Sequence, residues 1–217
     1  MNLADHIEHT LLKPDATTEE LKRLFDEAKH HKFKGICINP INVKMAKNHL
    51  KDSGVKIITV VGFPLGANLP EVKAFETQKA IEDGADEIDM VISIQGIKNA
   101  DWASVKQDIQ KVREASQNKI LKVIIETDLL SDDEIVKACE IAVEAKADFV
   151  KTSTGFVKNG IGAKAEDVSL MSSIVKDTDV KIKASGGIKS KDQALQLIEA
   201  GAVRLGTSCG VEINKAE

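Results

Sequence analysis

The chain has 217 residues, of which 42% are hydrophobic, 29% charged and only 3% aromatic, and its formal net charge is −4. This balance is typical of a folded globular protein and excludes a disordered or collagen-like chain. An acidic chain offers the nucleic-acid backbone no electrostatic footprint, so we expect no nucleic-acid partner.

The sequence also lacks the signals of a membrane or secreted protein. No apolar run approaches the roughly 18 residues that a membrane span needs, and the start, MNLADHIEHT, lacks the basic and apolar segments of a secretory signal. Cys37, Cys139 and Cys209 lie far apart and form no CxxC pair. We therefore expect a cytoplasmic protein with no membrane partner, no disulfide framework and no cysteine zinc site.

Short β-branched runs alternate along the chain with amphipathic stretches of helical period. The predicted strands lie at 7–12, 34–38, 56–61, 87–92, 121–126, 148–152, 180–184 and 202–205. The predicted helices lie at 17–31, 41–52, 70–83, 100–116, 131–146, 164–177 and 190–200. Capping pairs indicate several helix starts: Thr17 or Thr18 with Glu20, Ser131 with Glu134, and Ser190 with Gln193. Glycines indicate several helix ends: Gly35, Gly54, Gly84 and Gly201.

Repeated β-α units predict a parallel sheet, either doubly wound or closed into a barrel. The strands of a doubly wound sheet are apolar on both faces, whereas here Ile88 and Met90 alternate with Glu87 and Asp89. Such polar residues fit the inside of a barrel, where charges can pair. The predicted fold is an α/β, single (β/α)8 TIM barrel domain over residues 1–217, with a short N-terminal helical extension.

Active sites of such barrels lie at the C-terminal ends of the strands, where the sequence places Asp89, Lys151 and Lys183. A lysine with its ordinary pKa of about 10.4 is protonated at pH 7, so a nucleophilic lysine needs burial or a nearby cation. Two inward lysines on neighbouring strands could meet this need, and Asp89 could move protons. Alternatively, the lysines are structural ion-pair partners of Asp89, Glu87 or Glu126. The residues alone leave open which lysine would be the nucleophile.

Glycine-rich turns follow the last two predicted strands, at Ser185-Gly186-Gly187 and at 206–210. Backbone amides in such turns can bind an anion, and barrels usually hold a substrate phosphate at this place. Cys37 fits either a small buried hydrophobe or a reactive thiol. The histidines form no HxxxH or HExxH motif, so we expect no metal and no cofactor.

The strings EHTLLKPDAT, GICINP, VVGFPLGAN, GADEIDMVI, LKVIIET, ADFVKTSTGF, KASGGI and RLGTSCGV, in this order over residues 6–212, resemble the deoxyribose-phosphate aldolase family. The resemblance implies a metal-free class I aldolase, a carbon–carbon lyase. Such an enzyme reversibly cleaves 2-deoxy-D-ribose 5-phosphate to acetaldehyde and D-glyceraldehyde 3-phosphate in deoxyribonucleoside catabolism. It also implies that Lys151 forms the Schiff base, that Lys183 perturbs the ionisation of that lysine and relays protons, and that Asp89 donates and accepts protons.

The resemblance further implies a sugar phosphate as the small-molecule partner, and barrels of this kind often pair, which makes a homodimer a candidate assembly. The implied substrate-binding residues are Glu8, Thr10, Cys37, Thr154, Gly155, Gly186, Gly187, Ser208 and Cys209, the last through its backbone N–H. Cys37 would also react with an enal formed from excess acetaldehyde.

The chain departs from the family pattern at several positions. Glu8 stands where Asp is usual, ISIQGIKN replaces the usual INIGALKD, Asp128 replaces a small or apolar residue, and Cys209 replaces a serine. Lys158 adds a cation that would help hold the phosphate, whereas no tyrosine-ended tail precedes the end at Glu217. Rival interpretations are a transaldolase-like enzyme, a phosphosugar epimerase or isomerase, and a sugar-phosphate-binding protein without turnover.

Overall fold

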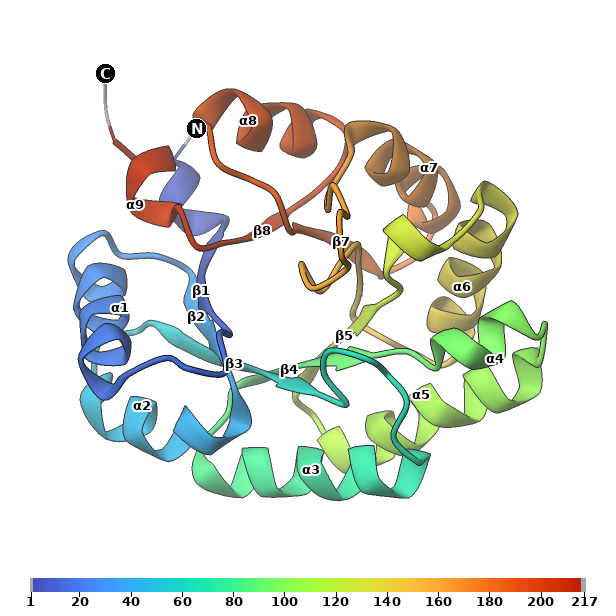
Figure 1. Ribbon diagram of the computed structural model, residues 1–217, viewed down its shortest axis with the longest axis horizontal. Coiled ribbons are helices and arrows are strands. Elements are labelled where there is room, and N and C mark those ends of the chain that lie inside the picture. Colours follow the sequence, from blue (N-terminus) through green and yellow to red (C-terminus); the bar gives the residue numbers. More distant parts are fainter. Residues whose placement is uncertain (1, 216–217) are drawn as a thin grey trace.

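The computed structural model describes residues 2–215, so the chain end at Glu217 lies outside the described residues. Strands and helices alternate around a ring (Figure 1). The strands are β1 (Ile7–Leu11), β2 (Gly35–Ile38), β3 (Lys56–Val61), β4 (Glu87–Val91), β5 (Ile120–Ile124), β6 (Phe149–Lys151), β7 (Lys181–Ser185) and β8 (Arg204–Thr207). The α-helices are α1 (Thr18–His30), α2 (Val43–His49), α3 (Pro70–Asp83), α4 (Ile94–Lys98), α5 (Trp102–Ser116), α6 (Asp132–Glu144), α7 (Ala165–Val175), α8 (Lys191–Glu199) and α9 (Gly210–Ile213).

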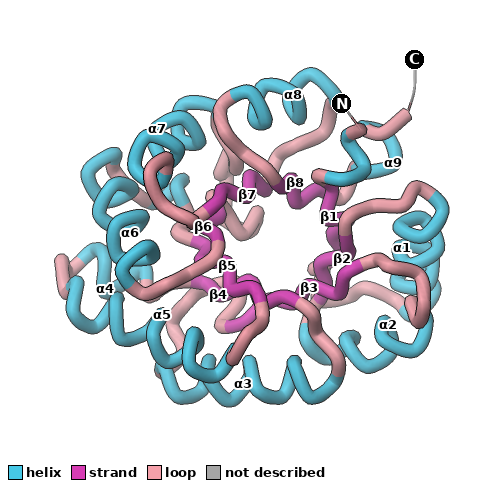
Figure 2. The backbone as a smooth tube through the Cα atoms, turned by 180° about the vertical axis from the view of Figure 1, so that it is seen from behind, coloured by secondary structure: helices cyan, strands magenta, loops and turns pink. Residues whose placement is uncertain are grey.

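The strands close into a parallel barrel in which each strand pairs with its neighbour in sequence and β8 returns to β1. The closing register sets Glu8 beside Gly206. Seen from behind, the strands form an inner ring surrounded by the helices (Figure 2). The predicted barrel is therefore confirmed, and the doubly wound alternative is wrong.

The alternation along the strands separates two layers, as predicted. Ile88 and Met90 point outward into the large apolar core between strands and helices, whereas Glu87 and Asp89 point into the barrel and are buried there. Because aliphatic side chains fill the outer layer, the barrel can keep charged groups at its centre. No helix among residues 2–215 is long and apolar enough to cross a membrane.

The local signals mark the helix starts well. Thr17, Ser131 and Ser190 each form the predicted capping box, with side chain and backbone bonds in both directions. The predicted helix end at Gly35 is wrong, because α1 ends at His30 and Gly35 begins β2. A Cβ at Gly35 would lie 2.7 Å from the Lys56 carbonyl oxygen, so strand packing requires this glycine.

Three 3-10 turns and two short helices of residues 2–215 are shorter than the hydrophobic periodicity can reveal. The N-terminal helical extension is one 3-10 turn, Leu3–Asp5. Two further 3-10 turns lie at Pro40–Asn42 and Thr127–Leu129. The helices α4 and α9 were not predicted, since five and four residues are too few to show a helical period.

Candidate active site

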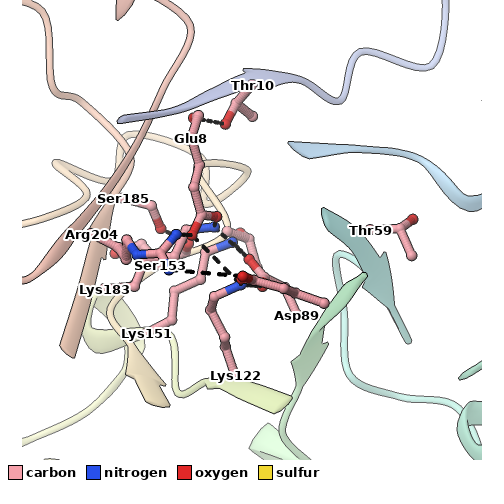
Figure 3. Close-up of polar contacts among 12 residues, drawn as sticks. Glu8, Thr10, Thr59, Asp89, Lys122, Lys151, Ser153, Lys183, Ser185 and Arg204 are labelled. Atoms are coloured by element: carbon pink, nitrogen blue, oxygen red, sulfur yellow. Dashed lines mark hydrogen bonds and ion pairs between the residues drawn. The ribbon is translucent and has the colours of Figure 1, made fainter. Parts of the chain in front are cut away.

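Three strands bring the predicted triad together inside the barrel, with Asp89 and Lys183 in the middle of β4 and β7 rather than at their ends (Figure 3). Lys151 is the last residue of β6, and its Nζ donates to Asp89 Oδ2 at 2.8 Å. Lys183 of β7 donates to the same oxygen at 2.6 Å. The register of the sheet places Lys151 directly beside Lys183 on the neighbouring strand. The Nζ atoms of the two lysines therefore share one carboxylate oxygen.

The triad continues into a wider network of buried charges. Glu8 of β1 accepts a hydrogen bond from Lys183 and lies 3.4 Å from an Arg204 guanidinium nitrogen. Lys122 of β5 lies 2.9 Å from Asp89, 2.5 Å from Glu87 and 3.6 Å from Glu8. Ion pairs within 4 Å thus join four cations to three carboxylates.

These contacts determine the ionisation of the buried groups. Burial acts to raise the pKa of Asp89, but Lys122, Lys151 and Lys183 outweigh it and hold that pKa well below its ordinary value. Burial acts to lower the pKa of Lys183, but Asp89 and Glu8 outweigh it and raise that pKa. Asp89 is therefore ionised and Lys183 is protonated in the resting protein.

Above the triad, a cavity of about 310 Å³ opens at the C-terminal ends of the strands. Its lining comprises Thr10, Leu11, Leu12, Lys13, Lys151, Thr154, Gly155, Phe156, Ser185, Gly186, Gly187, Ile188, Lys189, Gly206, Thr207 and Ser208. Gly186 and Gly187 have positive φ angles of 85° and 73°. A Cβ at Gly187 would lie 2.2 Å from the Ile161 carbonyl oxygen, so this turn needs glycine. Its backbone therefore borders the cavity closely, with the cations Lys13 and Lys189 nearby.

The structure separates the expected substrate-binding residues into two groups. Those that line the cavity are Thr10, Thr154, Gly155, Gly186, Gly187 and Ser208. Glu8, Cys37 and Cys209 do not line it. Glu8 is fully buried in the charge network, and the Cys209 N–H donates to Thr207 Oγ1 at 2.9 Å.

Cys37 lies on β2 in a small apolar cluster with Leu12, Ile58 and Val60. Burial raises the pKa of its thiol, against the opposing effect of Lys183 and Lys151. The side chain is therefore a neutral thiol in the resting protein, close enough to the triad to sense its charge.

The expectation that Glu126 is an ion-pair partner of Lys151 or Lys183 is wrong. Its carboxylate forms no ion pair within 4 Å among the described residues and instead accepts hydrogen bonds from Thr154. Sequence reasoning also missed Arg204, Lys13 and Lys189. Arg204 could have been found as a charged residue inside a predicted strand. Lys13 and Lys189 could not, because they lie in loops whose course places them at the cavity. Residues 2–215 contain no group of three or more His, Cys, Asp or Glu side chains that could hold a metal ion.

The fold and site define an α/β barrel in which a lysine lies at the bottom of a cavity at the C-terminal ends of the strands. The sequence matches the DeoC/LacD family aldolase over residues 3–216. The chain belongs to this aldolase family.

Similar proteins from bacteria cover the whole chain. One from Streptococcus gordonii, named deoxyribose-phosphate aldolase, is 54% identical over 217 residues, which are 100% of this chain and 97% of its own. Another of that name, from Clostridium botulinum strain Langeland, is 53% identical over 98% of this chain and 99% of its own. A Staphylococcus aureus protein named deoxyribose-phosphate aldolase 2 is 53% identical over 98% of this chain and 96% of its own.

Solved structures agree with the fold. A crystal structure from Coccidioides immitis superimposes with a TM-score of 0.96 at 40% identity and covers 98% of this chain and 84% of its own. The deoxyribose phosphate aldolase from Aeropyrum pernix, described as a unique tetrameric structure, gives a TM-score of 0.88 at 32% identity. That match covers 98% of this chain and 89% of the other.

Proposed function

We propose that this protein is a class I deoxyribose-phosphate aldolase. It reversibly cleaves 2-deoxy-D-ribose 5-phosphate to acetaldehyde and D-glyceraldehyde 3-phosphate, through an imine on Lys151, in the catabolism of deoxyribose phosphate in the cytoplasm. The observation that carries the proposal is the position of Lys151. Its amine reaches the floor of the cavity while sharing Asp89 with the ammonium group of Lys183. The names of the close relatives support the same substrate.

The charge balance of the network supports Lys151 rather than Lys183 as the nucleophile. The network has one cation more than it has carboxylates, and an unpaired buried charge is costly. Lys183 has two carboxylate partners, whereas within residues 2–215 Lys151 has Asp89 alone, which it shares. Loss of a proton from Lys151 balances the charges and leaves an amine facing the cavity.

The chemistry begins when the neutral amine of Lys151 attacks C1 of the open-chain sugar. Loss of water from the adduct gives a protonated imine, which withdraws electrons from the C2–C3 bond. That bond breaks as the C3 hydroxyl loses its proton, and the C2–C3 electron pair forms an enamine while D-glyceraldehyde 3-phosphate leaves. Protonation of the enamine at C2 and hydrolysis of the imine release acetaldehyde and restore Lys151.

Asp89 moves protons in these steps, whereas Lys183 has a different role from the proton relay that the family resemblance implied. The cation on Lys151 is among the causes that lower the pKa of Asp89. When Lys151 loses its charge, this contribution disappears and Asp89 becomes a better base, able to take and return a proton through a water molecule. Lys183 keeps its proton through the cycle and acts as a fixed charge that disfavours a second ammonium group beside it.

The opposite side of the cavity fits the phosphate. The turn at Gly186 and Gly187 and the hydroxyl of Ser208 offer hydrogen-bond donors, while Lys13 and Lys189 provide charge. A phosphate held there leaves room for the sugar between the turn and Lys151, past Thr154. The cavity volume of about 310 Å³ suits a small substrate of this class.

The first experiment is reductive trapping with acetaldehyde and borohydride, followed by peptide mapping. We expect an ethyl group on Lys151 in the wild type and no adduct in Lys151→Arg. The matched control is Lys137→Arg, a change on the exposed side of α6, which should be labelled like the wild type. An isomerase or a binding protein would give no adduct on any lysine, and that result would overturn the proposal.

A second assay distinguishes the enzyme from a transaldolase-like relative, which would also form an imine. Release of acetaldehyde from 2-deoxyribose 5-phosphate is followed by its enzymatic reduction with NADH. We expect cleavage without added acceptor aldehyde. Trapping at Lys151 together with no cleavage of this substrate would refute the assigned substrate and leave the imine chemistry standing.

A further inference from the structure

Glu126 occupies an unusual position two residues after the end of β5. Its backbone is left-handed, with φ 62° and ψ 66°, although it is not a glycine. Its side chain is only 1% exposed. A non-glycine residue in this conformation is strained, and such strain persists where the surroundings hold the residue in place. In a regular strand Glu126 would point toward the lysines, whereas here the turn directs it to the loop after β6.

The carboxylate of Glu126 holds Thr154 from two sides. Its Oε1 accepts from the Thr154 backbone N at 3.1 Å, and its Oε2 accepts from the Thr154 hydroxyl. The same hydroxyl accepts from the Phe156 backbone N at 3.0 Å. Thr154 also lines the substrate cavity, three residues after Lys151.

These bonds fix the polarity of the Thr154 hydroxyl. A hydroxyl has one proton to donate and two lone pairs to accept with. The proton is committed to Glu126 and one lone pair to Phe156, so one lone pair is left for a ligand. Thr154 can therefore accept a hydrogen bond from the substrate but cannot donate one.

We propose that Glu126 is a positioning residue that makes Thr154 an obligate hydrogen-bond acceptor for the C4 hydroxyl of the sugar phosphate. This inference rests on the proposed function. The C4 hydroxyl lies between the reacting C3 and the phosphate, and Thr154 lines the same cavity as Lys151 and the Gly186 turn. A phosphate oxygen or any other acceptor placed against this lone pair is repelled, so Thr154 also helps keep the phosphate at the far end of the cavity.

Burying the Glu126 carboxylate lowers the stability of the fold, which favours a functional role for this residue over a structural one. Burial raises the pKa of Glu126, and Asp128 adds to this, while the Thr154 hydrogen bonds and Lys151 oppose it. A carboxyl whose pKa is raised by folding contributes stability below its unfolded pKa and loses it as the pH rises through the folded pKa. Above that folded pKa the ionised Glu126 therefore lowers the stability of the fold.

Glu126→Gln tests the polarity, because the amide can keep both contacts while reversing one. Its carbonyl oxygen still accepts from the Thr154 N, but its NH2 group donates to the Thr154 hydroxyl. That hydroxyl then receives two donors and turns its own proton toward the cavity. The variant should unfold at a temperature no lower than the wild type at pH 7. The matched control is Glu140→Gln, an exposed carboxylate of α6.

The decisive readout is a preference between two substrates. One is 2-deoxyribose 5-phosphate, and the other is its analogue with fluorine, an acceptor only, in place of the C4 hydroxyl. We expect the wild type and Glu140→Gln to prefer the natural substrate in kcat/KM by about 100-fold or more, because the fluorine faces a lone pair. In Glu126→Gln that ratio should fall by about tenfold, the value of one hydrogen bond. Trapping of acetaldehyde on Lys151 should not change.

An unchanged substrate ratio in folded Glu126→Gln would overturn the proposal, and so would a loss of acetaldehyde trapping with a lowered unfolding temperature. Calorimetric binding of the two sugar phosphates provides the same ratio without turnover. If the wild type binds but does not cleave, the proposed function fails, and the ratio of the two Kd values still decides the role of Glu126. Thr154→Val should remove the effect, so that adding Glu126→Gln to it changes the ratio no further.

Discussion

Glu8 provides a sharp test of the buried charge network. It was expected to contact the substrate, yet it is fully buried and pairs with Lys183, Arg204 and Lys122. Glu8→Gln keeps the shape of the side chain and removes its charge. The network then has two cations more than carboxylates, and Lys183 depends on an Asp89 that two other lysines also contact.

The magnitude follows from the burial of the broken pair. Removing one partner of a buried ion pair costs about 3–5 kcal/mol. In a protein of this size each kcal/mol lowers the unfolding temperature by about 2–4 °C, which gives a decrease of about 6–20 °C for Glu8→Gln. Glu8→Asp keeps the charge and loses one methylene, so it should cost only about 1 kcal/mol.

Thermal unfolding at pH 7, followed by circular dichroism, measures both variants. Burial acts to raise the pKa of Glu8, but Lys122 and Lys183 outweigh burial and hold that pKa below its ordinary value. A lowered carboxyl pKa adds stability above the unfolded pKa, and that stability is lost as the pH falls through the folded value. The difference in unfolding temperature between Glu8→Gln and the wild type should therefore be constant from pH 7 to about 5 and become smaller in stronger acid. If Glu8→Gln unfolds at the same temperature as the wild type at pH 7, the reasoning about the charge network is wrong.

Three further outcomes follow from other parts of the chain. Lys73→Met should lower the free energy of unfolding by about 3–5 kcal/mol in urea titrations, since it leaves the buried Asp108 carboxylate, 2.7 Å away, without its ion-pair partner. Adding Asp108→Leu should recover most of this loss. Inactivation by excess acetaldehyde should accelerate as the pH rises, because burial raises the pKa of Cys37, and Cys37→Ser should be protected; equal inactivation of that variant would contradict the role. The outer face of α3 exposes Val72 and Phe75, 48% and 60% accessible, so we expect a homodimer in sedimentation velocity that Phe75→Glu converts to monomers; unaltered sedimentation would exclude this face.

The sequence predicts the layers of the barrel better than the partners within it. Alternation places Asp89 and Lys183 inside because side chains of a strand point to opposite faces. The same rule assigns Glu126 to the lysines and fails, since β5 ends at Ile124 and the left-handed backbone of Glu126 turns its side chain away. A dihedral angle of this kind at a glutamate has no signature in the residue pattern.

Glu8 and Cys209 show a second limit, which concerns competition between partners. Both positions were assigned to the substrate by resemblance, and each side chain or N–H is already engaged inside the protein. One added methylene brings a carboxylate to Lys183 across the barrel, a distance that depends on how far strand β1 lies from β7. Closure of the barrel fixes that spacing, and no local pattern carries it.

The two layers of the barrel have opposite energetic roles. The outer layer of Ile, Val, Leu and Ala supplies the burial that stabilises the fold. The inner layer of seven charged groups gains little over an apolar filling of the same volume, because desolvation offsets most of the attraction between buried ions. What the inner layer does provide is a fixed excess of positive charge around Asp89, on which the proposed role of Lys151 depends. The stability of the fold and the chemistry proposed for Lys151 therefore depend on opposite faces of the same strands, because successive side chains of a strand point to opposite sides.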